Sequence, residues 1–167
     1  TGIATFNTAC PSYEEWDKGH VSDCRFVYIA DDKIVGFVVL SSTSSRCVYK
    51  GCVEMSIYVD NDFKGKGIGT KLVNYVIDAA KKYGYWSILS TVISINEASI
   101  ALHKRCGFRE IGYREKIAKD RFGNWQNTTL FELRLESKVD KADNYFKNGF
   151  NCSQALFATF ADEFGLS

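Results

Sequence analysis

A strand, a loop that holds three glycines and a long amphipathic helix follow one another in the middle of the chain, and this succession constrains the fold most. Residues 53–59 alternate apolar with polar side chains, which is typical of a half-buried strand. Residues 67–83 have apolar side chains at helical spacing, and Gly84 is a typical residue at which such a helix ends. Residues 86–93 then have the pattern of a buried strand. A strand–helix–strand unit predicts two parallel strands joined by a right-handed crossover.

Further elements on both sides of this unit predict a mixed sheet covered by helices. Residues 25–30 and 33–40 are rich in aromatic and β-branched side chains, and Asp31 and Asp32 between them predict a hairpin. The remaining predictions are a short helix over residues 11–18, a helix over 96–106, strands over 109–118 and 125–135, and two amphipathic helices over 138–148 and 152–164. The fold class is therefore α/β (α+β), a mostly antiparallel mixed sheet flanked by helices. We expect a first domain over residues 1–136 and a helical segment over residues 137–167.

The charge and hydropathy of the chain exclude two kinds of partner. Lys plus Arg number 21 and Asp plus Glu number 20, so a net charge of +1 provides no field for binding nucleic acid or an acidic membrane. No segment approaches the roughly 20 apolar residues that cross a bilayer. The first residues also lack the basic and apolar regions of a signal peptide. We therefore expect a cytoplasmic protein.

The cysteines and histidines indicate neither a disulfide scaffold nor a metal site. Six cysteines are spread through a chain of 167 residues, which is long enough to bury its own core, so free thiols are expected. There is no CxxC pair, and His20 and His103 are far apart in the sequence. Zinc binding needs a closely spaced set of such ligands, and we expect no metal.

The loop between the strand and the helix is suited to bind a phosphate. Gly65, Gly67 and Gly69 remove side chains where a ligand approaches the backbone, and the free amides of the next helical turn favour an anion. Lys64 and Lys66 add positive charge. The spacing fits neither a nucleotide-hydrolysing P-loop nor the GxGxxG loop of dinucleotide enzymes. A glycine-rich turn that merely enters the helix is the equal alternative.

Two motifs resemble those of the GNAT N-acetyltransferases. The segment from Lys64 to Gly69 fits the family's Q/R-x-x-G-x-G/A loop, with Lys64 in place of Gln or Arg. The family's second pattern, N-x-x-A/S-x-x-L-Y/H-x-x-x-G-F, is met by Asn96, Ser99, Leu102, His103, Gly107 and Phe108. Within the family the chain resembles the phosphinothricin acetyltransferases in the stretches at residues 4–6, 46–59 and 122–125. The resemblance covers about residues 1–135.

This resemblance implies a GNAT-type fold, acetyl-CoA as co-substrate and transfer of its acetyl group to the amine of a small molecule. An amino acid, or a compound similar to phosphinothricin or methionine sulfone, would be the acceptor, and a homodimer is expected. For acetyl-CoA the implied binding residues are Tyr58, Val59, Lys64, Gly65, Lys66, Gly67, Ile68, Gly69, Thr70, Asn96, Ser99 and His103. Asn96 is equally suited to cap its helix, and Ser99 to face solvent.

Two residues are candidates for catalysis. Glu54 lies on the polar face of its strand with Ser56 and Tyr58, and the resemblance implies that it accepts the proton of the amine. The alternative is a solvated Glu on an exposed strand face. His103 is a candidate for protonating the departing thiolate or orienting the cofactor, although a lone histidine on a helix is usually structural.

The acceptor amine is expected near Glu54. Arg46 and Tyr49 lie just before it in the sequence, and a guanidinium is suited to hold a carboxylate at two points. A surface Arg in a serine-rich loop is the alternative. Phe6 is a candidate for the wall of the acceptor pocket, although an aromatic at such a position is more often part of the core.

Two departures from the family and two rival functions remain. Members usually have a strand and a helix ahead of the stretch at residues 4–6, and we expect this unit to be absent and the two C-terminal helices to cover the surface so exposed. The tail resembles the start of a cysteine-rich redox family, but Cys152 stands without that family's later cysteines. A non-catalytic acetyl-CoA sensor and a thiol redox protein are the rival functions.

Overall fold

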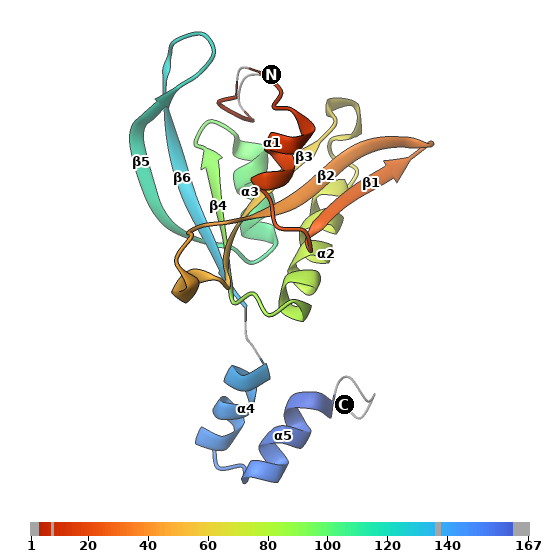
Figure 1. The fold of residues 1–167 in the computed structure, drawn as a ribbon, viewed down its shortest axis with the longest axis vertical. Helices are drawn as coiled ribbons and strands as arrows, with labels where there is room; N and C mark the ends of the chain where they lie inside the picture. Colours follow the sequence, from red (N-terminus) through yellow and green to blue (C-terminus); the bar gives the residue numbers. More distant parts are fainter. Residues whose placement is uncertain (1–3, 8, 136–137, 162–167) are drawn as a thin grey trace. The chain divides into compact units, whose positions relative to one another are not determined.

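The computed structural model describes residues 4–7, 9–135 and 138–161. The chain forms two compact units, Thr1–Arg134 and Leu135–Ser167. The first unit is built on a six-stranded sheet with the order β1-β2-β3-β4-β6-β5 (Figure 1). Its strands are β1 (Arg25–Ala30), β2 (Lys33–Ser42), β3 (Cys52–Val59), β4 (Ser87–Ile93), β5 (Arg109–Lys119) and β6 (Trp125–Arg134). Strands β3 and β4 pair in parallel and each of the other neighbouring pairs is antiparallel, which confirms the predicted fold class.

The hairpin of β1 and β2 is closed by the two residues that its sequence predicts. Asp31 and Asp32 have φ of 50° and 59°. Two consecutive left-handed residues match the right-handed twist of the strands, and Asp tolerates this conformation better than most residues.

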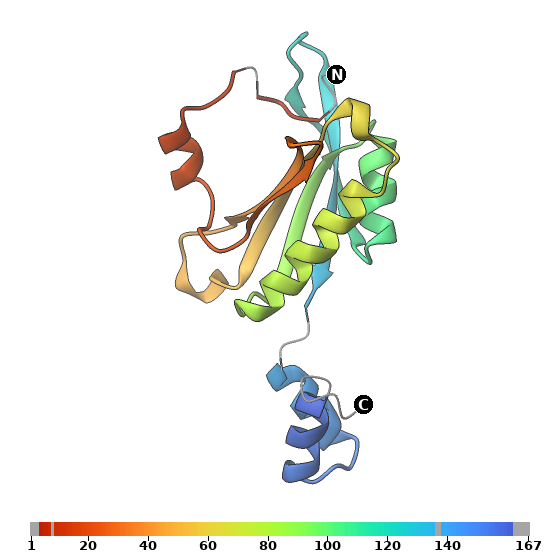
Figure 2. The same cartoon turned by 90° about the vertical axis from the view of Figure 1, so that its right-hand side faces the viewer.

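Helices lie on both sides of the sheet. Figure 2 shows α2 (Ile68–Lys82) and α3 (Glu97–Arg105) on one face and α1 (Tyr13–Lys18) on the side of the other. Of these three helices, only α2 and α3 cover a face of the sheet. Helix α2 buries one stripe at helical spacing, and Gly84 follows its end with φ of 81°, as predicted. The buried stripe consists of Ile68, Leu72, Val73, Val76, Ile77 and Ala80.

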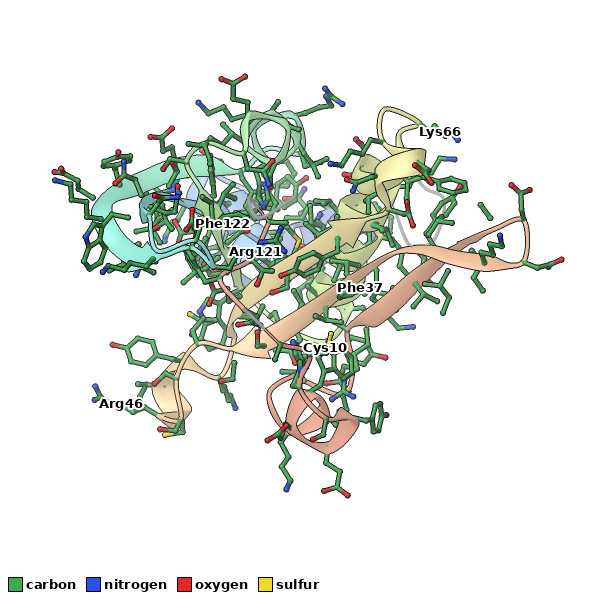
Figure 3. The ribbon with its side chains drawn as sticks, turned by 90° about the horizontal axis from the view of Figure 1, so that it is seen from above. Cys10, Phe37, Arg46, Lys66, Arg121 and Phe122 are labelled. Carbon is green, nitrogen blue, oxygen red and sulfur yellow. The ribbon has the colours of Figure 1, made fainter. Side chains whose placement is uncertain are left out.

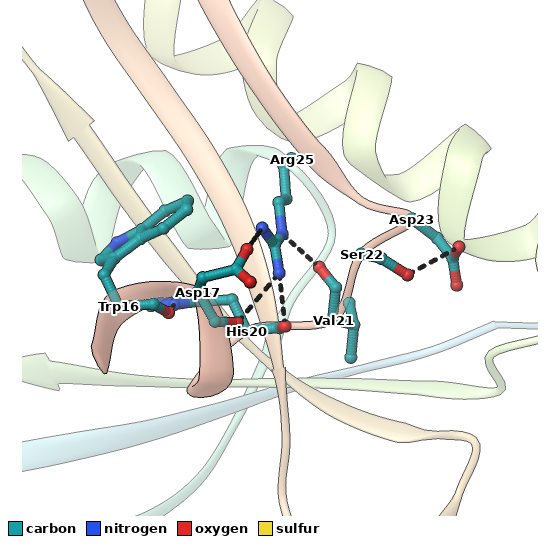
Figure 4. Close-up of polar contacts among 7 residues, drawn as sticks. All are labelled: Trp16, Asp17, His20, Val21, Ser22, Asp23 and Arg25. Atoms are coloured by element: carbon teal, nitrogen blue, oxygen red, sulfur yellow. Dashed lines mark hydrogen bonds and ion pairs between the residues drawn. The ribbon is translucent and has the colours of Figure 1, made fainter. Parts of the chain in front are cut away.

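Arg25 at the start of β1 fastens α1 to the sheet (Figure 4). Its guanidinium forms an ion pair with Asp17 and donates to the carbonyls of Val21 (2.6 Å), His20 (2.7 Å) and Asp17 (3.0 Å). It also lies 5.2 Å from the centre of the Trp16 ring. One side chain thereby satisfies three carbonyls at the end of a six-residue helix, which is too short to be stable alone.

Strands β3 and β4 separate before either of them ends. Their paired residues run from Cys52 with Ser87 to Glu54 with Leu89, whereas β3 continues to Val59. The short helix η2 (Asn61–Phe63) and the glycine loop then lead into α2. The second half of β3 therefore leaves its backbone free on the side of β4. We refer to this opening, beyond the Glu54–Leu89 pair, as the split.

The second unit consists of α4 (Lys138–Lys147) and α5 (Cys152–Phe160). The rings of Tyr145 and Phe150 are 5.2 Å apart, and Asn151 begins α5 with a capping box that includes Gln154. Residues 162–164, the last part of the predicted helix, lie outside the described residues. Covering of the first unit by these helices stays a prediction. Among the described residues no helix is long and apolar enough to cross a membrane.

Candidate active site

The end of β3, the start of α2 and one side of α3 enclose a cleft of about 660 Å³. Its walls comprise Ala4, residues 57–61, residues 63–65, residues 67–70, and Asn96, Ala98, Ser99, Ala101, Leu102 and Arg105 of α3. The structure therefore brings together ten of the twelve residues predicted to bind acetyl-CoA. Lys66 and His103 are the two that do not line the cleft.

The three glycines of the loop have different surroundings. Gly65 and Gly67 have φ of 76° and 77°, and a Cβ at either position would meet no atom within 4 Å. Gly67 begins α2 without a side-chain cap, so the first amides of the helix are open to a ligand in the cleft. Gly69 instead allows close packing of the helices, because its Cβ would lie 3.0 Å from Cδ2 of Leu102.

The lysines around this loop point in different directions. Lys64 lines the cleft. Nζ of Lys66 lies 4.3 Å from the centre of the Phe63 ring, and Figure 3 shows Lys66 at the outer edge of the loop. Nζ of Lys71 lies 3.3 Å from the hydroxyl of Tyr28. Lys66 thus does not line the cleft, because its ammonium group lies over a neighbouring aromatic ring, and its part in binding acetyl-CoA stays a prediction.

Helix α3 supplies residues of the cleft that the sequence analysis did not identify. Ala98, Ala101, Leu102 and Arg105 line it at the spacing i, i+3, i+4 and i+7, which is one face of a helix. This helical spacing is visible in the sequence and could have identified them. Arg105 adds a cation to the wall that α3 forms.

Asn96 and Ser99 combine the two roles that the sequence left open. The side-chain oxygen of Asn96 accepts a hydrogen bond from the amide of Ser99 at 3.2 Å, so that Asn96 caps α3. Both residues also line the cleft. The capped end of the helix is thus one wall of the candidate binding site.

His103 lies in the core and not in the cleft. It is 1% exposed, and its ring stacks on that of Phe131 and meets that of Phe108 edge to face. Its Nδ1 is 2.7 Å from the carbonyl of Ser99 and its Nε2 is 2.8 Å from the hydroxyl of Ser90. Burial lowers the pKa of the imidazole below its usual value. This arrangement corrects the prediction that His103 protonates the thiolate, because both nitrogens are bonded inside the protein.

Glu54 lies at the split, on the sheet face opposite to α2 and α3. It belongs to the last pair of β3 with β4, is half-buried, and accepts a hydrogen bond from the hydroxyl of Thr91 at 2.8 Å. Ser56 and Tyr58 follow on the same face of the strand, and the ring of Tyr58 stacks on Phe37 at 5.1 Å. Tyr58 also lines the cleft. Glu54 and Ser56 do not line the cleft, and Tyr58 is the residue of this polar face that borders it.

The predicted acceptor residues do not line this cleft. Arg46 lies over the ring of Tyr49 at 5.7 Å in the exposed loop that contains η1 (Cys47–Tyr49). Figure 3 shows Arg46 at the opposite end of the unit from Lys66, directed away from the sheet. Phe6 is half-buried, and Ala4, two residues before it, lines the cleft. The roles of Phe6, Arg46 and Tyr49 stay predictions.

Cysteines and acidic residues form no metal site in the part of the chain that the structure describes, since no three His, Cys, Asp or Glu side chains are grouped to hold an ion. All six cysteines are free thiols. Cys152 is exposed at the start of α5.

Known proteins resemble the chain over much of the first unit. Residues 3–108 match the acetyltransferase (GNAT) family. An L-methionine sulfoximine/L-methionine sulfone acetyltransferase of Pseudomonas aeruginosa is 36% identical over 88 residues, which are 53% of this chain and 51% of that protein. A phosphinothricin N-acetyltransferase of Alcaligenes faecalis is 30% identical over 144 residues, which are 82% of this chain and 72% of that protein.

Solved structures show the same architecture. The structure of yncA from Salmonella typhimurium with its cofactor acetyl-CoA superposes with a TM-score of 0.64 at 30% identity, over 66% of this chain and 64% of that one. The chain thus spans about half the length of the Pseudomonas relative and about two thirds of yncA. The family match covers more than half of the chain, and the fold and the glycine loop agree with it. The chain therefore belongs to the acetyltransferase (GNAT) family.

Proposed function

We propose that the protein transfers the acetyl group of acetyl-CoA to the amine of a small molecule of the amino-acid type. The observation that carries this proposal is the cleft itself. It joins an open glycine loop at the start of a helix to the split between two parallel strands. A donor with a diphosphate at one end and an acyl group on a long arm has the shape and charge for such a site.

The donor lies along the cleft in this proposal. Its diphosphate meets the amides at the start of α2 beside Gly67, where the helix dipole and Lys64 favour negative charge. Its arm extends along residues 57–60 toward the split, with Asn96 and Ser99 on the opposite wall. The carbonyl of the thioester then receives hydrogen bonds from the backbone of β3 that pairing with β4 leaves free.

Glu54 is the proposed proton acceptor. An alkyl ammonium with a pKa near 10 costs about 4 kcal/mol to deprotonate at pH 7, at about 1.4 kcal/mol per unit. The ammonium group first loses one proton to Glu54, directly or through water, and the neutral nitrogen then bonds to the thioester carbon. As the carbon–sulfur bond breaks, the nitrogen loses its second proton, which passes to the departing thiolate directly or through water. Thr91 orients the carboxylate through its bond of 2.8 Å.

The names of two relatives support an amino-acid acceptor. The Pseudomonas and Alcaligenes relatives are named for methionine sulfoximine, methionine sulfone and phosphinothricin. Arg46 and Tyr49 would supply the carboxylate contact and Phe6 an apolar wall. These assignments form part of the proposal.

A homodimer in the cytosol completes the proposal. Strand β5 lies at the edge of the sheet and exposes the apolar side chains of Ile111 (46%), Tyr113 (57%) and Ile117 (46%), so this edge is where we propose a second copy to bind. Six free thiols suit a reducing compartment.

Release of the CoA thiol from acetyl-CoA tests the activity. The assay uses the full chain and a panel of amino acids, methionine sulfone, methionine sulfoximine, phosphinothricin and unrelated amines. We expect turnover with at least one amino-acid-type amine. Absence of turnover with acetyl-CoA bound would contradict the enzyme and favour a sensor.

Glu54→Gln separates the two functions further. We expect kcat to fall by about 10²–10⁴, which is the usual contribution of a general base. Glu110→Gln is the matched control, because Glu110 is an exposed carboxylate that pairs with Lys104 outside the cleft. Equal rates for the two variants would refute the role of Glu54.

A further inference from the structure

The hydrogen bonds of His103 define its proton positions. A carbonyl oxygen only accepts, so Nδ1 carries the proton and donates to the carbonyl of Ser99 at 2.7 Å. The neutral ring then has an acceptor at Nε2, and the hydroxyl of Ser90 donates to it at 2.8 Å. The ring thus links the backbone of α3 to a side chain of β4.

The surroundings of the ring keep it neutral and fixed. The ring centres of Phe108 and Phe131 lie 5.1 Å and 5.4 Å from that of His103, and both phenylalanines are at most 4% exposed. Burial lowers the pKa of His103, which disfavours a second proton. A buried group with both nitrogens bonded costs little to bury, whereas loss of one partner leaves an unpaired polar atom.

Ser90 lies at the beginning of the split. Leu89 is the last residue of β4 that pairs with β3, so Ser90 and Met55 are the first residues beyond the pairing. The Ser90 hydroxyl oxygen is also 3.5 Å from the carbonyl of Met55. Its single proton serves one acceptor at a time, and the bond of 2.8 Å to His103 is the stronger one.

The other side of the same helix turn lines the cleft. Ser99, whose carbonyl receives the proton of His103, is a wall residue, as are Ala98, Ala101 and Leu102. A shift of this turn toward or away from β3 would therefore change the width of the cleft. The link from Ser99 through His103 to Ser90 opposes such a shift at the point where the two strands separate.

We propose that His103 is a positioning residue, which through Ser90 holds α3 at a fixed distance from the split and so sets the width of the channel that takes the arm of the donor. This inference rests on the proposed function. It assigns to His103 no contact with the donor and no proton transfer.

Calorimetric titration of the full chain with acetyl-CoA tests the proposal. Ser90→Ala removes the donor to Nε2. His103→Asn keeps an amide group near the position of Nδ1 but does not reach Ser90. We expect each variant to raise the Kd for acetyl-CoA at least fivefold. The double variant should raise it no further, because both changes break the same link.

Two controls separate positioning from general loss of stability. Phe131→Leu removes a stacked ring and no hydrogen bond, so it should lower the stability and leave the Kd for acetyl-CoA within twofold of the unchanged chain. Adenosine 3′,5′-bisphosphate, the end of CoA without the arm, should bind the Ser90→Ala and His103→Asn variants as it binds the unchanged chain. Amide hydrogen exchange of the free chain should become faster in α3 and stay the same in α2.

Kinetics separate positioning from proton donation. A positioning role predicts that His103→Asn raises the KM for acetyl-CoA with kcat within about threefold, whereas a proton donor would lose kcat at constant KM. Unchanged Kd in both variants, or an equal rise in Phe131→Leu, would overturn the proposal. Failure of the unchanged chain to bind acetyl-CoA would overturn the proposed function and this role together. Failure of the role alone is distinguishable, because the unchanged chain then still binds acetyl-CoA.

Discussion

Substitution of Gly67 by Ala tests the glycine loop with a single methyl group. Gly67 has φ of 77°, and a Cβ there would meet no protein atom within 4 Å. The cost to the protein is therefore only that of the left-handed backbone, about 1–2 kcal/mol for a residue with a Cβ. For a chain of 167 residues this lowers Tm by roughly 2–8 °C.

The effect on donor binding should be larger than the effect on stability. Gly67 lines the cleft at the first amides of α2, so the new methyl group stands where the diphosphate approaches the backbone. Loss of one hydrogen bond from an amide to a charged group corresponds to about 1.5–3 kcal/mol. The Kd for acetyl-CoA should accordingly rise by a factor of about 10–100.

Gly84→Ala is the matched control at the other end of the same helix. Gly84 has φ of 81° and equally open surroundings, and it does not line the cleft. Both variants should lose similar stability in thermal unfolding, whereas calorimetry should find weaker acetyl-CoA binding only for Gly67→Ala. Equal affinities in the two variants would refute the assignment of the loop to the diphosphate.

Three further predictions concern the core, the buried histidine and the loop. Gly51→Ala should destabilise the protein by about 3 kcal/mol in urea unfolding, because its Cβ would lie 2.1 Å from Cε3 of Trp86; an unchanged midpoint would contradict this packing. Burial lowers the pKa of His103 in the folded protein. The stability that the neutral imidazole contributes is therefore fully present above the pKa of the unfolded chain, near 6.5, and is lost as pH falls from there toward the pKa of the folded protein. The slope is up to about 1.4 kcal/mol per pH unit, and His103→Gln should lack it when unfolding is compared at pH 7.5 and 5.5. Lys64→Ala should weaken acetyl-CoA binding more than Lys66→Ala, and the opposite order in titrations at low salt would contradict the direction of these side chains.

The order and type of the main helices and strands follow from local sequence patterns, so they could be predicted from the sequence. The helix predicted over residues 67–83 is observed as Ile68–Lys82, and the strand predicted over residues 53–59 as Cys52–Val59. The turn at Asp31 and Asp32 is likewise local. Periodicity and turn chemistry act within a few residues, so they are readable without the fold.

The split and the position of His103 depend on contacts between distant segments. Where β3 ceases to pair with β4 is decided by residues 35 positions apart, and the alternation within β3 is the same on both sides of that point. His103 was ambiguous because one residue on a helix fits either the cleft or the core. Its partner Ser90, 13 residues away, has no pattern that marks it. The contact of Lys66 with the ring of Phe63 is local, since the two are three residues apart, but it lies in a loop where no periodic pattern predicts it.

Small residues contribute to both walls of the cleft. Gly65 and Gly67 leave the backbone bare on one side, and on the other α3 lines the cleft with the methyl groups of Ala98 and Ala101 beside the longer Leu102 and Arg105. Gly69 lets the two helices meet at Leu102 and so closes the cleft behind. Protein interiors pack closely, so a cleft lined by small side chains stays open only if the helix that carries them is held in place. The buried side of α3, where His103 bonds to Ser99 and Ser90, is therefore as important for the site as the side that lines the cleft.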